Sequence, residues 1–422
     1  MTVQPQPTNA PRLHYAWVVA VVTFFVLLLA AGARTMAAVF IVPLEGEFGW
    51  TRSAISAAIS IGILWFGLGG PVGGALIDRF GPRRIMVCGL ALVTAGLVLM
   101  LRLEQLWQLH LFWGVLVGIG TGAVANVMGA TIASRWFRQH RGVIIGLFGA
   151  ASAAGQLIFQ PTMMSLTATT GWRSGITLAA IALAVMIIPT LLFMRDRPEE
   201  KGLRPYGDDG TPATAAAASD QQRTPLRAAA QTRDFWLLAF SFFICGWTTN
   251  GLVQTHLLPH AIEHGFDPVR TSQVVGLMGL FNIVGTLASG WLSDRVDNRY
   301  LLACYYGLRG LSIAMLPLIG SMLGLSAFAV IYGLDWIATV PPTINLTAQR
   351  FGRASVGTLY GWIFFSHMVG AAVAAYTGGL LHDLLGDYTV AFVIAGVMGL
   401  LAVAFSLGIS SPRRMQAAQA AA

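Results

Sequence analysis

Long apolar runs alternate with short polar segments along almost the whole chain of 422 residues. Each run is near the ~20 residues that a helix needs to cross the hydrocarbon core of a bilayer. Because lipid offers no water to backbone N–H and C=O groups, helices are the expected solution. The pattern predicts an all-α membrane protein with twelve transmembrane helices, at residues 16–40, 54–77, 85–101, 111–134, 142–167, 176–194, 235–260, 272–293, 301–320, 325–348, 356–381 and 390–409.

Two charged turns between these runs repeat each other. Residues 74–84 read Gly-Ala-Leu-Ile-Asp-Arg-Phe-Gly-Pro-Arg-Arg, and residues 290–299 read Gly-Trp-Leu-Ser-Asp-Arg-Val-Asp-Asn-Arg. The matching pairs are Gly74 and Gly290, Asp78 and Asp294, and Arg79 and Arg295, each 216 positions apart. Such a repeat indicates that one half of the chain is a copy of the other. We expect two pseudo-symmetric six-helix bundles at 1–194 and 234–422, joined by a cytoplasmic linker at 195–233.

The residue spacing in these turns suits a gate. The glycine would let one helix end lie close to a neighbour, and the aspartate follows one helical turn later. There it could cap an adjacent helix and pair with arginines, in contacts that break when helices slide. The alternative is that the turns only end helices and keep arginine on one side of the membrane. The gating candidates are Gly74, Asp78, Arg79, Arg83, Arg84, Gly290, Asp294 and Arg295.

The first turn resembles the loop motif between helices 2 and 3 of the major facilitator superfamily. The second turn resembles the weaker copy of that motif between helices 8 and 9. The resemblance covers the chain after about the first fifteen residues. It implies two six-helix bundles, alternating access and a central substrate cavity, in keeping with the repeat architecture of secondary transporters.

Composition and charge support a membrane location and an orientation. Hydrophobic residues make up 55% of the chain and charged residues 10%, against about 25% charged in soluble domains. The formal net charge of +8 does not indicate nucleic-acid binding, because the arginines sit in short loops between apolar runs. With a cytoplasmic N-terminus, 20 Lys and Arg face the cytoplasm and four lie outside, at Arg52, Arg102, Arg173 and Arg270. This asymmetry predicts a cell inner membrane protein with both termini cytoplasmic.

The sequence gives no indication of a cofactor, a metal site or an enzyme. The three cysteines, Cys88, Cys245 and Cys304, lie inside apolar runs without a CxxC pair. They are typical of small buried residues, not of a disulfide framework or metal ligands. We also find no nucleophile–base signature and no phosphate-binding loop, and we expect a monomer.

Arg34 is the strongest candidate for substrate binding. It lies in the outer half of the first span, where a charge costs about 2.5–3.5 kcal/mol and needs a partner or a purpose. The resemblance implies that this helix lines the cavity, and an arginine fork suits a carboxylate. Alternatively, Arg34 snorkels outward or pairs with Glu45 or Glu47.

Arg309 and Asp335 are the other two charges within the spans. Spans nine and ten are neighbours in a hairpin, so the two residues can form a buried structural ion pair. Alternatively, Asp335 carries a proton whose binding changes when Arg309 moves, which would couple transport to the proton gradient.

Other polar residues within the spans are candidates for the cavity lining. The double proline 341–342 should interrupt span ten and free backbone carbonyls there. A histidine in a span can donate to a carboxylate, although it is more often a satisfied core residue. The further substrate-binding candidates are Asn126, Gln156, Gln160, Asn250, Gln254, His256, Asn282, Trp362 and His367.

The segment that follows Arg34 resembles the end of helix 1 in the monocarboxylate and oxalate–formate branches of the superfamily. Residues 42–53 read Val-Pro-Leu-Glu-Gly-Glu-Phe-Gly-Trp-Thr-Arg-Ser, and the linker start Arg-Pro-Glu-Glu-Lys-Gly also resembles these branches. Two departures leave the substrate open. Monocarboxylate carriers have an Asp–Arg pair on helix 8, where this chain has Asn282 and Thr286. Oxalate carriers have a lysine on helix 11, whereas the single lysine here is Lys201.

Three functions compete at this point. The first is a secondary transporter that moves a small, monocarboxylate-like organic anion across the bilayer by alternating access, with proton symport. The second is efflux of drugs or metabolites by proton antiport, for which Arg34 would be dispensable. The third, a membrane-embedded enzyme or sensor, has no supporting constellation of residues.

Overall fold

The structure, a computed structural model, describes residues 14–208, 224–352 and 355–410. These residues are mostly helical. Eleven helices are long and apolar enough to cross a membrane, or twelve if the pair α3 and α4, bent by 54°, counts as one span. The predicted twelve-helix membrane fold is thereby confirmed.

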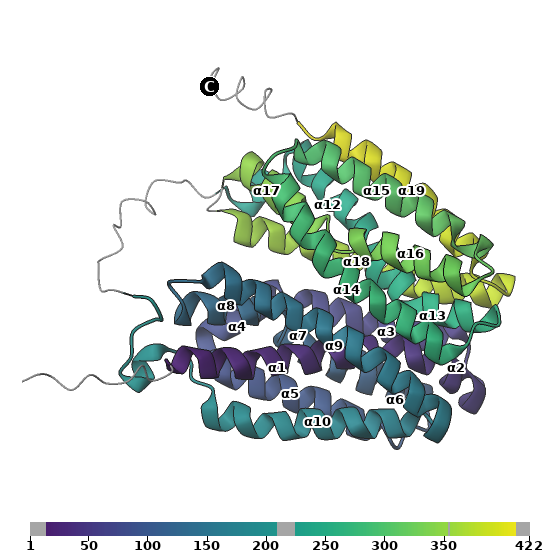
Figure 1. Cartoon of the computed structure of the whole chain (residues 1–422), viewed down its shortest axis with the longest axis horizontal. Coiled ribbons are helices and arrows are strands. Elements are labelled where there is room, and N and C mark those ends of the chain that lie inside the picture. Colours follow the sequence, from purple (N-terminus) through teal and green to yellow (C-terminus); the bar gives the residue numbers. More distant parts are fainter. Residues whose placement is uncertain (1–13, 209–223, 353–354, 411–422) are drawn as a thin grey trace, which may run out of the picture.

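Figure 1 shows two bundles, with the first half of the chain below and the second half above. The first half contains α1 (Tyr15–Thr35), α2 (Ala37–Phe48), α3 (Arg52–Leu68), α4 (Pro71–Phe80), α5 (Pro82–Met100), α6 (Leu106–Leu109), the π-helix η1 (His110–Val117), α7 (Gly118–Ala123), α8 (Asn126–Trp136), α9 (Arg141–Thr170) and α10 (Trp172–Phe193). The 3-10 helix η2 (Pro198–Lys201) lies in the connection that follows.

The second half repeats this order of helices. It contains α11 (Leu226–Ala230), α12 (Arg233–Gly246), the π-helix η4 (Trp247–Val253), α13 (Gln254–Glu263), α14 (Pro268–Ser293), α15 (Asn298–Met315), the 3-10 helix η5 (Leu316–Leu318), α16 (Met322–Asp335), α17 (Val340–Phe351), α18 (Val356–Leu385) and α19 (Thr389–Gly408). The predicted boundaries at 194 and 234 stay our working division of the chain.

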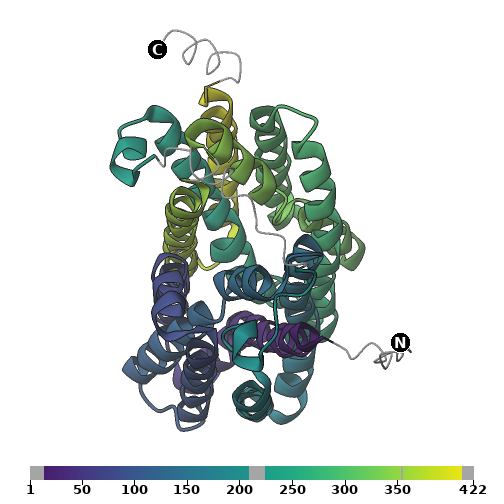
Figure 2. The same ribbon diagram turned by 90° about the vertical axis from the view of Figure 1, so that its left-hand side faces the viewer.

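The two halves meet through two helix pairs, α3 with α18 and α9 with α14. They meet again at one end, where α2 packs against α13. At the opposite end α8 and α17 lie apart (Figure 1), and the view turned by 90° looks onto this end (Figure 2). The structure is therefore asymmetric along the helices, closed where α2 meets α13 and separated at the other end.

Several spans are interrupted near their middle. The first span breaks at Met36, between α1 and α2, and the seventh contains the π-helix η4. In the tenth span the helix stops after Asp335 and resumes at Val340, so that Pro341 and Pro342 lie in the first turn of α17. Proline is tolerated there because the N–H groups of a first turn have no helical partner. The predicted interruption of span ten is confirmed.

Asp78 and Asp294 of the two repeated turns cap no helix among the described residues, which corrects one half of our prediction. The other half, a pairing with arginine, is present at Asp78, which forms an ion pair with Arg135 of α8 at 3.0 Å. The carboxylate at the start of α5 belongs to Asp196, which accepts from the backbone N–H of Arg83 at 2.7 Å. The prediction considered residues one turn apart on the same helix. The carboxylate that accepts from the start of α5 instead comes from a segment more than a hundred residues away.

The second turn also lacks the predicted helix cap by its first aspartate. Asp294 stands at the C-terminal end of α14, and Asp297 caps α15 through the N–H of Arg299. Arg295 donates to the carbonyl of Trp291 and lies over its ring. A Cβ on Gly290 would meet no atom within 4 Å, so the expected close helix approach is wrong for this conformation. The physical reason is that these turns lie at the separated end of the molecule.

A glycine that does hold two helices together is Gly246, at the end of α12. A Cβ at this position would overlap the carbonyl of His367 in α18. We expect Gly246→Ala to destabilise the protein by about 1–3 kcal/mol, the usual cost of overpacking. Thermal unfolding of the purified protein in detergent measures this, with Gly290→Ala as the matched control that has room for the methyl group. Equal melting temperatures for the two variants would contradict the prediction.

Candidate substrate-binding site

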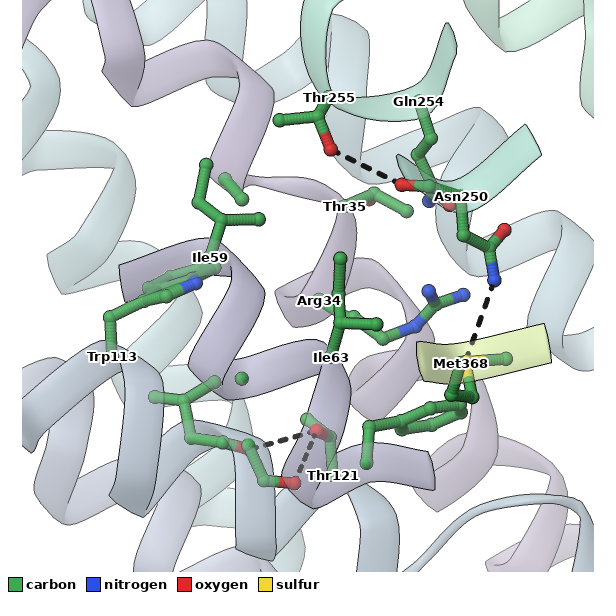
Figure 3. Close-up of a pocket in the computed structure, with 15 residues that line it drawn as sticks. Arg34, Thr35, Ile59, Ile63, Trp113, Thr121, Asn250, Gln254, Thr255 and Met368 are labelled. Carbon is green, nitrogen blue, oxygen red and sulfur yellow. Dashed lines mark hydrogen bonds between the residues drawn. The ribbon is translucent and has the colours of Figure 1, made fainter. Parts of the chain in front are cut away.

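A pocket of about 40 Å³ lies at the interface of the two halves (Figure 3). Its volume would hold a few water molecules, since one water needs about 10–15 Å³. Two of the interrupted spans, the first and the seventh, contribute to it. The lining residues are Arg34, Thr35, Ala37, Ile59, Gly62, Ile63, Phe66, Trp113, Val117, Gly118, Thr121, Asn250, Gln254, Thr255 and Met368.

Arg34 lies in the last turn of α1, beside the break at Met36. Its guanidinium stacks over the ring of Phe66, 4.8 Å from the centroid, and extends toward Asn250 and Met368 in Figure 3. No hydrogen bond or ion pair involves its side chain within the described part of the chain. A half-buried cation without a counter-charge is costly, and the pocket thus contains one positive charge that no described protein group neutralises.

The two carboxylates nearest in sequence have other partners. Glu45 pairs with Arg52 at 2.8 Å, and Glu47 pairs with Arg173 at 2.7 Å and accepts from Trp172. The alternative interpretation, in which one of them neutralises Arg34, is therefore wrong in this conformation. The reason is that the break after α1 separates Arg34 from the helical segment on which both glutamates lie.

The second half supplies uncharged polar groups opposite Arg34. Asn250 lies in the π-helix η4, and Gln254 and Thr255 begin α13. The carbonyl oxygen of the Gln254 side chain is buried without a partner in the described chain, while the Thr255 hydroxyl donates to the carbonyl of Asn250 at 3.2 Å. Arg34 and Asn250 are 216 positions apart, the offset of the repeated turns. The duplication thus places a cation and an amide at equivalent points of the two halves.

The remaining wall of the pocket is apolar. Ile59, Ile63 and Phe66 come from α3, Trp113 from η1 and Met368 from α18. The pocket therefore offers one positive charge, a few hydrogen-bonding groups and an apolar surface. This is the usual composition of a small-molecule site, in which few polar groups fix the orientation of the ligand.

Three of the predicted substrate-binding residues, Arg34, Asn250 and Gln254, lie together in this pocket. Thr35, Thr121 and Thr255 also line it and were not predicted. Thr121 stands between glycines, in Gly-Ile-Gly-Thr-Gly at 118–122. Such a hydroxyl, alone in a small-residue run of span four, was the available sequence signal.

The two predicted histidines lie outside the pocket. His256 is fully buried, with Nε2 at 2.8 Å from the carbonyl oxygen of Ala375 and Nδ1 at 3.3 Å from the Tyr388 hydroxyl. His367 is buried and stacks on Phe364. Both are thus packed within the second half in this conformation.

The other predicted residues are dispersed. Asn282 of α14 accepts from the backbone N–H of Ile337 at 3.1 Å, inside the break of span ten. Gln156 and Gln160 are on α9, each with a buried atom that lacks a partner in the described chain, and Trp362 is 40% exposed. The side chain of Asn126 lies outside the described part of the structure.

Arg309 and Asp335 form a buried ion pair away from the pocket. Arg309 Nε lies 2.6 Å from Asp335 Oδ2, and its Nη2 donates to the carbonyls of Asp335 and Trp336 at 2.6 and 3.2 Å. Its Nη1 lies 2.9 Å from Cys245 Sγ. The guanidinium thus satisfies carbonyls at the C-terminal end of α16, where a helix leaves them unpaired and negative charge accumulates.

Two pseudo-symmetric helical bundles with a polar pocket at their interface define the class of secondary transporters. Residues 23–375 match the family model described as Major Facilitator Superfamily, and the chain belongs to this family. Its members are transporters and not enzymes. Within the described residues, no group of three or more His, Cys, Asp or Glu side chains could hold a metal ion.

The individual proteins to which this chain is similar are also named as transporters. The chain is 29% identical over 405 residues to "Uncharacterized MFS-type transporter YcxA" of Bacillus subtilis (strain 168), covering 94% of this chain and 95% of that protein. It is 28% identical over 392 residues to "Monocarboxylate transporter 13" of Rattus norvegicus, covering 92% and 87%. The fold is similar to the crystal structure of a bacterial homologue of the human lysosomal transporter Spinster, inward-facing and unoccupied. That match has a TM-score of 0.75 at 14% identity and covers 96% and 98%.

Proposed function

We propose that this protein moves a small organic anion with a single negative charge, of the monocarboxylate type, by proton-coupled symport. The observation that carries the proposal is the half-buried Arg34 guanidinium in the pocket, which has no hydrogen-bond or ion-pair partner in the described chain. Its fork matches a carboxylate in two parallel hydrogen bonds. A bound anion would supply the negative counter-charge that no described protein group provides for Arg34.

The balance of groups in the pocket favours a monoanion over a dianion. Arg34 is the single charged residue in the lining, and the other polar members are uncharged threonines and amides. A second carboxylate would enter a site of low polarity without a counter-charge, which is costly. The apolar side, which includes Ile59 and Trp113, suits a short hydrocarbon or hydroxylated tail. The relative named "Monocarboxylate transporter 13" supports this substrate class.

The orientation of the two ends of the molecule follows from the predicted topology. With both termini cytoplasmic in the inner membrane, the closed end of α2 and α13 faces outward and the separated end faces the cytoplasm. We take the protein to act as a monomer. For the coupled proton, the sequence points to Asp335 with Arg309, and this hypothesis stays a prediction.

Uptake into proteoliposomes tests the proposal. We expect a panel of carboxylates to show accumulation of short monocarboxylates that rises several-fold with an inward proton gradient and collapses with a protonophore. Dicarboxylates of equal length should compete poorly. Extrusion of lipophilic cations in exchange for protons, without carboxylate uptake, would instead support the efflux alternative and overturn the proposal.

A further inference from the structure

Arg52 joins the two halves at the end where α2 meets α13. It is the first residue of α3, and its side chain is only 4% exposed. Its Nε lies 2.8 Å from Glu45 of the same half. Its Nη2 lies 2.5 Å from Glu263 Oε1, and its Nη1 donates to the Tyr388 hydroxyl at 2.7 Å, both in the other half. The guanidinium thus bridges carboxylates of the two halves.

Asp383 adds a second connection at the same place. Its carboxylate accepts from the backbone N–H groups of Arg52 and Ser53 at 3.0 and 2.8 Å. These are the first two residues of α3, where a carboxylate is favoured by unpaired N–H groups and by the helix dipole. Asp383 belongs to α18 of the other half. We call Arg52, Glu45, Glu263, Tyr388 and Asp383 the Arg52 latch.

His382 competes with Arg52 for one oxygen of the latch. Its Nε2 lies 3.0 Å from Glu263 Oε1, the same atom that Arg52 Nη2 contacts. A carboxylate only accepts, so Nε2 carries a hydrogen and Nδ1 holds a free lone pair. Nδ1 is buried and has no partner in the described chain, although the side chain as a whole is 13% exposed. A proton on Nδ1 would therefore find no acceptor in this closed conformation, and it would favour a conformation in which water reaches the ring.

The groups that face His382 come from every neighbouring element. They are Glu263 and His256 of α13, Arg52 of α3, Tyr388 before α19, with ring centroids 4.6 Å apart, and Asp383 on its own helix. Of these, only Arg52 belongs to the first half. Both ring nitrogens of His256 are engaged. His260 also has an Nδ1 without a partner in the described chain, but its ring packs against Tyr388 and Phe392. His382 differs from both because its other nitrogen contacts the latch carboxylate of Glu263.

We propose that His382 is the proton-responsive element that opens the Arg52 latch. A proton on Nδ1 gives Glu263 a positively charged partner within its own half, in place of Arg52. Arg52 retains Glu45, so both halves keep a compensated charge pair after they separate. A charged His382 also repels Arg52 across the shared oxygen. The proposal rests on the proposed function for one point, that this end faces outward and receives protons from outside.

Distance measurements by electron paramagnetic resonance test the proposal without any substrate. Nitroxides at Arg102→Cys and Arg270→Cys, both exposed positions in the predicted outer loops, report the separation of the halves at this end. Cys88 and Cys304 are replaced by alanine, while the buried Cys245 stays. In lipid nanodiscs we expect the ratio of separated to closed molecules to rise about tenfold from pH 8 to pH 5.5, since the separated state binds the extra proton.

Two variants and a control make this result decisive. His382→Gln keeps a donor for Glu263 but cannot take up a proton, so the ratio should change less than about twofold. His264→Gln, at the same end of the molecule but with the His260 carbonyl as its one hydrogen-bond partner among the described residues, should behave like wild type. Glu263→Gln should be separated at every pH. A normal pH response in His382→Gln, or a closed and pH-responsive Glu263→Gln, overturns the proposal.

Failure of this proposal and failure of the proposed function have different signatures. If no carboxylate is transported but the distances respond to pH through His382, the latch proposal stands and the anion assignment falls. If carboxylate uptake depends on the proton gradient while the distances ignore His382, the reverse holds.

Discussion

Arg34→Ala should abolish carboxylate uptake while leaving the protein folded. Truncating one partner of a desolvated, hydrogen-bonded charge pair costs about 2–5 kcal/mol, so we expect kcat/KM for uptake to fall about 100-fold or more. Because Arg34 has no hydrogen-bond or ion-pair partner among the described residues that the truncation would leave unpaired, the melting temperature should stay the same or rise. Proteoliposome uptake and thermal unfolding of the same preparation measure both quantities.

Two milder variants serve as controls for this result. Arg34→Lys keeps the charge but loses the planar fork, and should raise KM with partial retention of transport. Asn250→Ala removes an amide donor that we expect to contact the bound anion from the second half, and should cost about 10- to 150-fold, as expected for a hydrogen bond to a charged group. Uptake that is unchanged in Arg34→Ala would place the anion site elsewhere in the molecule.

Arg309→Met should destabilise the second half more than any other single change considered above. Removing one partner of a buried ion pair costs about 3–5 kcal/mol, because Asp335 then remains as an uncompensated buried charge. The carbonyls at the end of α16 also lose their donor. Unfolding can be followed by the reaction of Cys245 with a thiol dye in a background without Cys88 and Cys304, since Cys245 is buried beside Arg309.

The double variant Arg309→Met with Asp335→Leu separates the two roles that the sequence left open. Replacing both ions by apolar residues of similar size is often neutral. If the pair is a structural brace for the break in span ten, the double variant should regain most of the lost stability and keep proton-driven uptake. If Asp335 carries the coupled proton, the double variant should exchange substrate across the membrane but not accumulate it.

Residues whose role depends on their own helix were predictable. Arg34 stands out because a charge in an apolar span needs a partner, and none was near in sequence. Asn250 and Gln254 stand out as polar residues at the matching depth of span seven. His256 carried the same signal, but the fold turns it toward Ala375 and Tyr388 instead of the pocket. The side of a helix that faces the cavity depends on the neighbouring helices.

The contacts at the two ends of the molecule could not be predicted from the sequence. The repeated turns were prominent in sequence, yet their aspartates do not make the predicted caps, and they lie at the separated end of this conformation. The Arg52 latch closes the other end, and in the sequence Arg52 counted only as one of four outer-loop arginines. Its partner Tyr388 lies 336 residues away. No local pattern marks a contact of that kind.

The sequence by itself determined that this is a duplicated helical membrane transporter with an arginine inside its first span, and the structure showed that neither Glu45 nor Glu47 neutralises it. Length of the apolar runs, the internal repeat and the distribution of arginine decide this, because the bilayer imposes its cost on each segment separately. Tertiary structure alone decided which polar groups share the pocket and which end is closed. Those outcomes depend on helix rotation and on ion pairs between distant segments, whose energies arise only when the two bundles pack.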